Sequence, residues 1–244
     1  MPPRFFAPDL RAHATFALPD EEAHHLRQVL RLGVGDVVLV FDGQGRQIRA
    51  RVERAARRGV WLTPLGDEPA AAEPTVALTV ALALLKTDRM DPAVRDVTMM
   101  GAVRIQPLLT ERTNAKRAAA ERGAGVDRWR RIAISSAKQS GRAVVPDIRP
   151  AMPFGRFLAA ATGKRLLLVE PAGPTGPTAS LSRNLPRPPA ATLAIGPEGG
   201  WTPDEVTHAV AAGFERLTLG SRVLRAETAP VAAMAILQYV WSDL

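Results

Sequence analysis

Three loops of this 244-residue chain hold the residue types most able to bind a ligand or to move charge. Each loop follows a short apolar run that is typical of a buried strand. The loops span residues 170–173 (EPAG), 195–205 (IGPEGGWTPDE) and 219–229 (LGSRVLRAETA). Ligands of open α/β sheets bind at the carboxyl ends of the parallel strands, so these loops predict one shared site. Glycines in the second loop allow close approach of the backbone to a ligand.

The charged side chains of these loops suggest two kinds of chemistry. Arg225 could stabilise an anion that forms during a reaction, or it could pair structurally with Glu227. Glu198 and Glu227 could each accept a proton, or could instead hold loop geometry or a neighbouring arginine. Glu205 fits a capping box with Thr202, and Trp201 is expected to pack behind its loop rather than stack on a base.

Several classes of site are excluded by composition and spacing. The chain has no cysteine, which excludes disulfides, thiolate metal sites and cysteine nucleophiles. The glycine-rich loop does not match GxGxxG, and no GK[ST] follows it, so neither a dinucleotide fingerprint nor a P-loop is present. The four histidines show no metal-ligand pattern with nearby acids, and no metal site is expected.

The elements that must position these loops follow two different patterns. Residues 20–32 predict a helix that Asp20 caps, and three short strands at 37–41, 47–53 and 60–63 are typical of a small β-barrel. Residues 66–74 (GDEPAAAEP) lack an apolar period and predict a linker. Beyond them strands and helices alternate, which indicates an α/β domain with a mostly parallel sheet. We therefore expect one domain over residues 1–72 and a second over 73–244.

The net charge of +8 suggests a polyanionic partner. Most of the basic residues are arginine, which a GC-rich genome could supply without selection for RNA binding. The excess is nevertheless concentrated, because residues 104–149 hold eleven basic and four acidic side chains, a net of +7. A basic face is expected there.

No apolar stretch is long enough to cross a bilayer and the N-terminus has no apolar signal core, so we expect a soluble cytoplasmic protein without a membrane partner.

The second and third loops resemble the two signature runs of the RsmE family, which belongs to the SPOUT methyltransferase superfamily. The family patterns are IGPEGG-F/W-S/T-x-x-E and LG-x-R-I/V-LR-x-ETA, and this chain has IGPEGGWTPDE and LGSRVLRAETA. It departs at residues 96–102 (DVTMMGA), where the family has K-x-T-E-L-G-V. Supporting similarities lie at Arg4 to Phe6, His25 with 29–31, 41–43, Lys86 with Asp91, 107–113, and 139–142 with Pro146.

The resemblance implies a PUA-like RNA-binding β-barrel followed by a SPOUT domain whose chain forms a trefoil knot at about residues 165–230. It also implies a homodimer that uses S-adenosyl-L-methionine to methylate N3 of one uridine of 16S rRNA, at position 1498 in the standard rRNA numbering, in the small ribosomal subunit. A non-catalytic rRNA-binding or ribosome-assembly protein that retains the fold is the alternative, and a nucleotide-dependent α/β enzyme is disfavoured by the missing phosphate motifs.

The resemblance also implies site residues. The catalytic candidates are Arg225, Glu198 and Glu227. The residues expected to bind the cofactor are Leu168, Glu170, Gly196, Pro197, Gly199, Gly200, Leu219, Gly220, Ser221, Leu224 and Arg225. Candidates for contacts with RNA, chosen for their charge, are Arg4, Arg11, Arg27, Arg31, Arg112, Lys116, Arg142 and Arg222.

Overall fold

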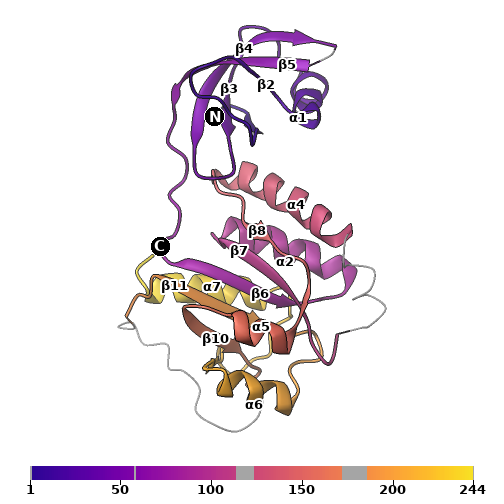
Figure 1. The fold of residues 1–244 in the computed structure, drawn as a ribbon, viewed down its shortest axis with the longest axis vertical. Helices are drawn as coiled ribbons and strands as arrows, with labels where there is room; N and C mark the ends of the chain where they lie inside the picture. Colours follow the sequence, from indigo (N-terminus) through magenta and orange to yellow (C-terminus); the bar gives the residue numbers. More distant parts are fainter. Residues whose placement is uncertain (1, 58, 114–123, 172–185, 244) are drawn as a thin grey trace. The chain divides into compact units, whose positions relative to one another are not determined.

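A computed structural model describes residues 2–57, 59–113, 124–171 and 186–243 of the chain. The chain divides into two compact units (Figure 1). The first unit contains Met1–Glu73 with Ile134–Val145, and the second contains Pro74–Ala133 with Pro146–Leu244. The first unit therefore includes a segment, 134–145, that lies far beyond residue 72 in the sequence.

The first unit is built on a five-stranded sheet in the order β1-β3-β4-β5-β2. Its pairs are antiparallel except for β1 with β3, and register shifts in the long β4–β5 pair bend the sheet. Phe5, Val38, Ile48 and Leu62 form part of one buried core. The strands are β1 (Arg4–Phe6), β2 (Phe16–Ala17), β3 (Val37–Phe41), β4 (Gln47–Ala56) and β5 (Gly59–Asp67).

Two local predictions for this unit are wrong in detail. The helix α1 (Asp20–His24) continues as a π-helical turn, η1 (His25–Val29), and Pro19 rather than Asp20 occupies the N-cap, without a side-chain cap. The predicted linker begins too early, because Gly66 and Asp67 still pair with β4. Strand pairing extends past the last apolar residue because its hydrogen bonds come from the backbone and do not require apolar side chains.

The second unit contains a parallel sheet, as the alternation of elements predicts. Its order is β12-β10-β11-β6-β7-β8, with β9 also paired to β7. The strands are β6 (Ala77–Ala83), β7 (Arg104–Leu109), β8 (Asp147–Ile148), β9 (Met152–Pro153), β10 (Lys164–Leu168), β11 (Ala190–Ile195) and β12 (Glu215–Leu217). The predicted fold class, an α/β fold with a parallel sheet preceded by a small β domain, is confirmed. The predicted knot stays a prediction.

Helices pack on both faces of the parallel sheet (Figure 1). Ala81, Leu167 and Ala194 face a core shared with α5 and α6, whereas their strand neighbours point to the opposite face. On that face α2 and α7 pack against each other, and Gln238 donates to the Met100 carbonyl at 2.6 Å. The helices of this unit are α2 (Thr87–Met99), α4 (Ala124–Ser140), whose last turns belong to the first unit, α5 (Phe154–Ala160), α6 (Pro203–Ala211) and α7 (Ala229–Val240). Within the described residues, no helix is both long and apolar enough to cross a membrane.

Candidate active site

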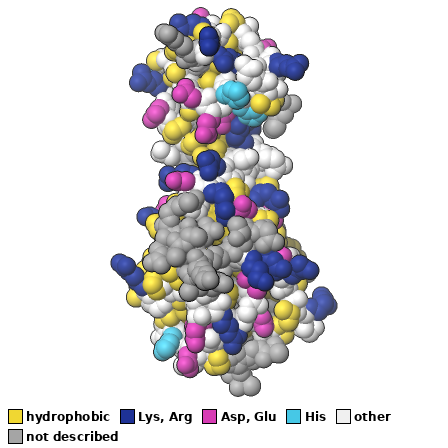
Figure 2. All heavy atoms as spheres, turned by 90° about the vertical axis from the view of Figure 1, so that its right-hand side faces the viewer, with side chains coloured by type: hydrophobic (Ala, Val, Ile, Leu, Met, Phe, Trp, Pro, Cys, Tyr) yellow, Lys and Arg dark blue, Asp and Glu magenta, His cyan; other side chains and the backbone are white. Residues whose placement is uncertain are grey.

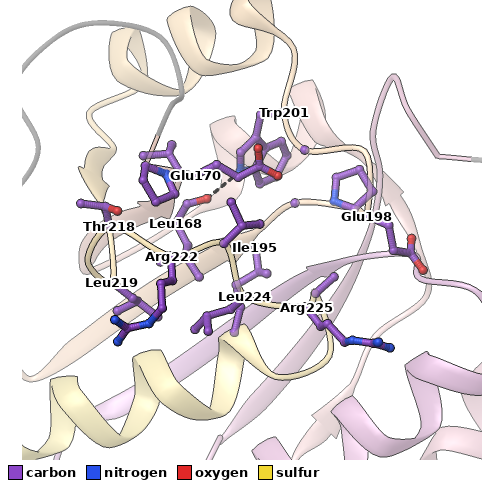
Figure 3. Close-up of a pocket in the computed structure, with 18 of the residues that line it drawn as sticks. Leu168, Glu170, Ile195, Glu198, Trp201, Thr218, Leu219, Arg222, Leu224 and Arg225 are labelled. Carbon is purple, nitrogen blue, oxygen red and sulfur yellow. Dashed lines mark hydrogen bonds between the residues drawn. The ribbon is translucent and has the colours of Figure 1, made fainter.

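The three loops singled out in the sequence meet at one pocket (Figure 3). They follow β10, β11 and β12, whose carboxyl ends lie together because the strands are parallel. The cavity measures about 300 Å³, which falls at the lower end of the range for small-molecule sites. Eight predicted cofactor residues line it: Leu168, Glu170, Gly196, Pro197, Gly200, Leu219, Leu224 and Arg225.

Three predicted cofactor residues do not line the pocket. Gly199 is exposed, and the Arg112 guanidinium donates to its carbonyl oxygen. Gly220 and Ser221 are also exposed, and the Gly220 carbonyl accepts a hydrogen bond from Thr218 at 3.3 Å. These residues shape the loops from outside rather than forming the cavity wall. Arg89 and Thr218, which lie outside the three predicted loops, also line the pocket, as do Ile195 and Val223, which lie in those loops but were not named as cofactor residues.

Tight packing around Trp201 determines the shape of the glycine-rich loop. The indole Nε1 donates to the Leu168 carbonyl at 2.9 Å, which ties this loop to the end of β10. A Cβ atom on Gly196 would lie 3.1 Å from the indole. Gly200 has φ of +70°, and a Cβ there would lie 3.2 Å from Oε1 of Glu170. Trp201 packs behind its loop as predicted, the positive φ of Gly200 favours glycine there, and a Cβ at Gly196 would be tightly packed against the indole.

The start of α6 is fastened by a capping box and by the loop after β7. The Thr202 hydroxyl accepts from the Glu205 amide, and the Thr202 amide donates to Glu205 Oε2 at 3.0 Å, which confirms the predicted box. The Thr202 hydroxyl also donates to Glu111 Oε2 at 2.8 Å. The Glu111 amide in turn donates to Glu205 Oε1 at 2.8 Å. These bonds fix the glycine-rich loop to the loop after β7.

The two candidate bases both have structural partners. Glu198 lines the pocket, but its Oε1 accepts from the Lys86 amide at 2.9 Å, and its carboxylate points away from Leu168 and Glu170 in Figure 3. Glu227 lies behind the lining residues, 3.7 Å from a guanidinium nitrogen of Arg89 and 4.0 Å from one of Arg225. These contacts therefore support the structural alternative for both residues. Glu198 holds a loop, and Glu227 holds an arginine.

The two candidate cations at the pocket are accessible. Arg222 and Arg225 both line it, and the Arg225 side chain is 74% exposed. An exposed guanidinium can bind an incoming anion, because it is not already held in a short ion pair. Arg225 therefore remains the strongest candidate for stabilising negative charge.

The predicted RNA contacts separate into internal and exposed residues. Arg142 is buried, with Glu73 at 2.5 Å. Arg4 donates to Gln47 and to the carbonyl oxygens of Ala137, Lys138 and Arg142, and its burial lowers the pKa of its guanidinium. The Arg27 guanidinium donates to the Ala56 carbonyl. Arg4 and Arg142 are thus structural, because their donors are already used inside the first unit.

The remaining candidates lie mainly at the surface. Arg11, Arg31, Arg112 and Arg222 are exposed, and Lys116 lies outside the described residues. Among the coloured side chains in Figure 2, basic side chains are interspersed with acidic ones. In the part of the chain that the structure describes, no group of three or more histidine, aspartate or glutamate side chains could hold a metal ion.

Family comparisons agree with the two-part organisation. A family model described as an RNA methyltransferase domain matches residues 72–238, and one described as an RNA methyltransferase PUA domain matches residues 18–65. The fold, the pocket and these matches define the class of protein as an RNA methyltransferase.

Individual relatives narrow this class. The chain is 37% identical over 233 residues to ribosomal RNA small subunit methyltransferase E of Synechocystis sp., covering 94% of this chain and 74% of that protein. The crystal structure of the same enzyme from Neisseria gonorrhoeae, bound to S-adenosyl methionine, has a TM-score of 0.86 at 32% identity and covers 99% of this chain and 98% of that one. A Legionella pneumophila methyltransferase in complex with SAM has a TM-score of 0.88 at 29% identity, covering 98% and 97%. This chain belongs to the ribosomal RNA small subunit methyltransferase E (RsmE) family.

Proposed function

We propose that this protein transfers a methyl group from S-adenosyl-L-methionine to N3 of one uridine of 16S rRNA, at position 1498 in the standard numbering, in the small ribosomal subunit. The observation that carries the proposal is the pocket that the three loops enclose at the ends of β10, β11 and β12. Family membership supplies the reaction type, and the pocket supplies a place for it.

The pocket fits a cofactor with a flat aromatic ring and several polar groups. Leu168, Ile195 and Leu219 offer apolar surface for the ring. Glu170 offers a carboxylate for hydroxyl or ammonium groups, and Gly196 and Gly200 leave room that a Cβ would fill. The cofactor supplies an activated methyl group on a sulfonium. No protein nucleophile is needed for the transfer, which is consistent with a chain that has no cysteine.

The protein must make uridine N3 nucleophilic, because N3 carries a proton in neutral uridine. Once this proton has passed to solvent water, Arg225 stabilises the uracil anion that remains. A donor placed at developing negative charge contributes about 3–4 kcal/mol of barrier reduction. Glu198 positions the loop through Lys86, and Glu227 pairs with Arg89.

The larger organisation is part of the proposal. The PUA-like domain over residues 1–72 positions RNA, and the SPOUT domain over residues 73–244 holds the cofactor, with a trefoil knot at about 165–230.

The protein acts as a homodimer in the cytoplasm. Ile236 and Tyr239 on α7 support a dimer, because both are large side chains left exposed on a helix that is otherwise rich in buried apolar residues. Arg11, Arg31, Arg112 and Arg222 are the exposed arginines retained for RNA contact.

Methyl transfer to small ribosomal subunits that lack this modification tests the proposal. The wild-type protein is expected to incorporate one methyl group per subunit, and mass spectrometry of 16S rRNA fragments should place it on uridine N3. Binding to the subunit without transfer would favour the alternative, a non-catalytic rRNA-binding protein. Calorimetry with S-adenosylmethionine and with NAD distinguishes the methyltransferase and the non-catalytic protein from a nucleotide-dependent enzyme, which would bind NAD instead.

A further inference from the structure

Arg89 brings a third arginine to the pocket from a different element. It lies in the first turns of α2, after the carboxyl end of β6, whereas Arg222 and Arg225 come from the loop after β12. Its side chain is 30% exposed, compared with 74% for Arg225. Arg89 is therefore more restrained than Arg225, and its guanidinium faces Glu227.

Glu227 lies between the two arginines. Its Oε2 is 3.7 Å from Nη1 of Arg89, and its Oε1 is 4.0 Å from Nη1 of Arg225. The carboxylate side chain is only 20% exposed, and Oε2 is buried without a hydrogen-bond partner. A half-buried carboxylate attracts nearby cations strongly, because few water molecules screen it. The two guanidinium groups therefore compete for the same carboxylate.

We propose that Arg89 is a positioning residue for methyl transfer, which neutralises Glu227 so that Arg225 stays extended and keeps its charge for the uracil anion. The inference rests on the proposed function, because it assigns Arg225 to that anion. If Arg89 were absent, Arg225 would be the remaining cation near Glu227 in this cluster. Arg225 would then fold onto the carboxylate, and its charge would be consumed in an ion pair.

This competition predicts an unusual pattern of rescue. Arg89→Met should lower the single-turnover rate of methyl transfer by about 10- to 100-fold, comparable to other losses of catalytic positioning. Rates are compared at saturating S-adenosylmethionine, because Arg89 lines the pocket, and the melting temperature should stay close to wild type. Glu227→Gln added to Arg89→Met should recover most of the lost rate, since the neutral amide no longer attracts Arg225. Arg89→Lys should retain more activity than Arg89→Met.

The pH dependence gives an independent readout. If Arg225 no longer favours the uracil anion, the acid limb of the pH–rate profile should move to higher pH in Arg89→Met and return in the double variant. Arg95→Met is the matched control, because Arg95 lies on the same helix but pairs with Asp96 and does not line the pocket. Its rate and profile should match wild type.

The possible results separate two kinds of failure. A wild-type protein that binds S-adenosylmethionine but transfers no methyl group to the small subunit overturns the proposed function. A wild-type protein that transfers normally, with Arg89→Met equally active, overturns the positioning role alone. The role is also overturned if Glu227→Gln does not rescue Arg89→Met, or if Glu227→Gln by itself abolishes transfer.

Discussion

Two arginines of this chain show how the surroundings of a residue determine its role. Arg142 and Arg225 each have a glutamate nearby. The Arg142 side chain is 4% exposed and lies 2.5 Å from Glu73, whereas Arg225 is largely exposed and lies 4.0 Å from Glu227. A buried, close pair is a structural contact whose loss leaves an uncompensated charge. A distant, exposed pair stabilises little and leaves the guanidinium available.

Substitution of Arg225 should separate catalysis from stability. Arg225→Ala is expected to lower methyl transfer by about 100- to 1,000-fold, because it removes the charge that stabilises the uracil anion. The free energy of unfolding should change by less than about 1 kcal/mol, since the pair with Glu227 is exposed on one side. Single-turnover kinetics and thermal unfolding measure the two effects. Near-normal turnover would remove Arg225 from the mechanism.

The positive φ of Gly200 makes that position sensitive to a single methyl group. Gly200→Ala should cost about 1–2 kcal/mol of stability, because the residue is held in the left-handed region. The new Cβ would also press on the Glu170 carboxylate and should weaken binding of S-adenosylmethionine in calorimetry. Gly155→Ala is the control, since a Cβ there meets no atom within 4 Å. Equal effects of the two substitutions would contradict this explanation.

At the scale of elements, the loops of the pocket are fixed by neighbouring loops more than by their own sequence. The glycine-rich loop is tied to β10 through Trp201 and to the β7 loop through Thr202 and Glu205. These bonds connect segments about 30 to 90 residues apart in the chain. Loop geometry therefore depends on the sheet that brings β10, β11 and β7 together, which explains why capping was predictable and the other ties were not.

The capping box and its link to Glu111 can be tested together. Thr202→Ala should destabilise the protein by about 1–2 kcal/mol, because it removes the acceptor for the Glu205 amide and the donor to Glu111. Thr207→Ala on the same helix is the control, and its hydroxyl only donates back to the Pro203 carbonyl. That variant should be neutral or slightly stabilising, since alanine has the higher helix propensity. Urea unfolding compares the two.

At the scale of the molecule, several of the basic residues of 104–149 that the structure describes are paired with acidic side chains. Arg104, Arg128, Lys138 and Arg149 have acidic partners in addition to the Arg142–Glu73 pair. Several of these partners come from distant parts of the sequence, including Glu22 and Asp91. Counting charges along a segment therefore overestimates the charge that is free for RNA, because partners are chosen in three dimensions.

The second unit is also closed by a contact between its two ends. Asp243, near the C-terminus, accepts hydrogen bonds from the Thr75 hydroxyl and amide and from the Val76 amide, at 2.6–2.9 Å. Burial alone would raise the pKa of Asp243, but these bonds and the charge of Arg187 lower it. The contribution to stability is therefore present above the unfolded-state pKa of about 3.9 and is lost as pH falls through the folded-state pKa.

Asp243→Asn should test this closure through its pH dependence. At pH 7 the variant should melt about 2 °C below wild type, as expected for a charged contact near the surface. The difference should shrink as pH falls through about 4 and below, because the wild-type carboxylate becomes protonated. Thermal unfolding over a pH series measures it, with Asp9→Asn as an exposed control in the first unit. A pH-independent difference would show that hydrogen-bond geometry, not charge, stabilises the contact.

The sequence alone determined the alternation of strands and helices, the capping box at Thr202 and the three loops of the pocket, because these depend on local periodicity, backbone preference and short motifs. Short elements such as β1, β8 and α5 were missed, since two to seven residues carry too little periodicity. Only the tertiary structure decided which charges are free. It buried Arg142 against Glu73, placed Arg89 beside Glu227, and left Arg225 extended, because an ion pair depends on distance in space and on exposure to water, and neither can be read from position in the chain.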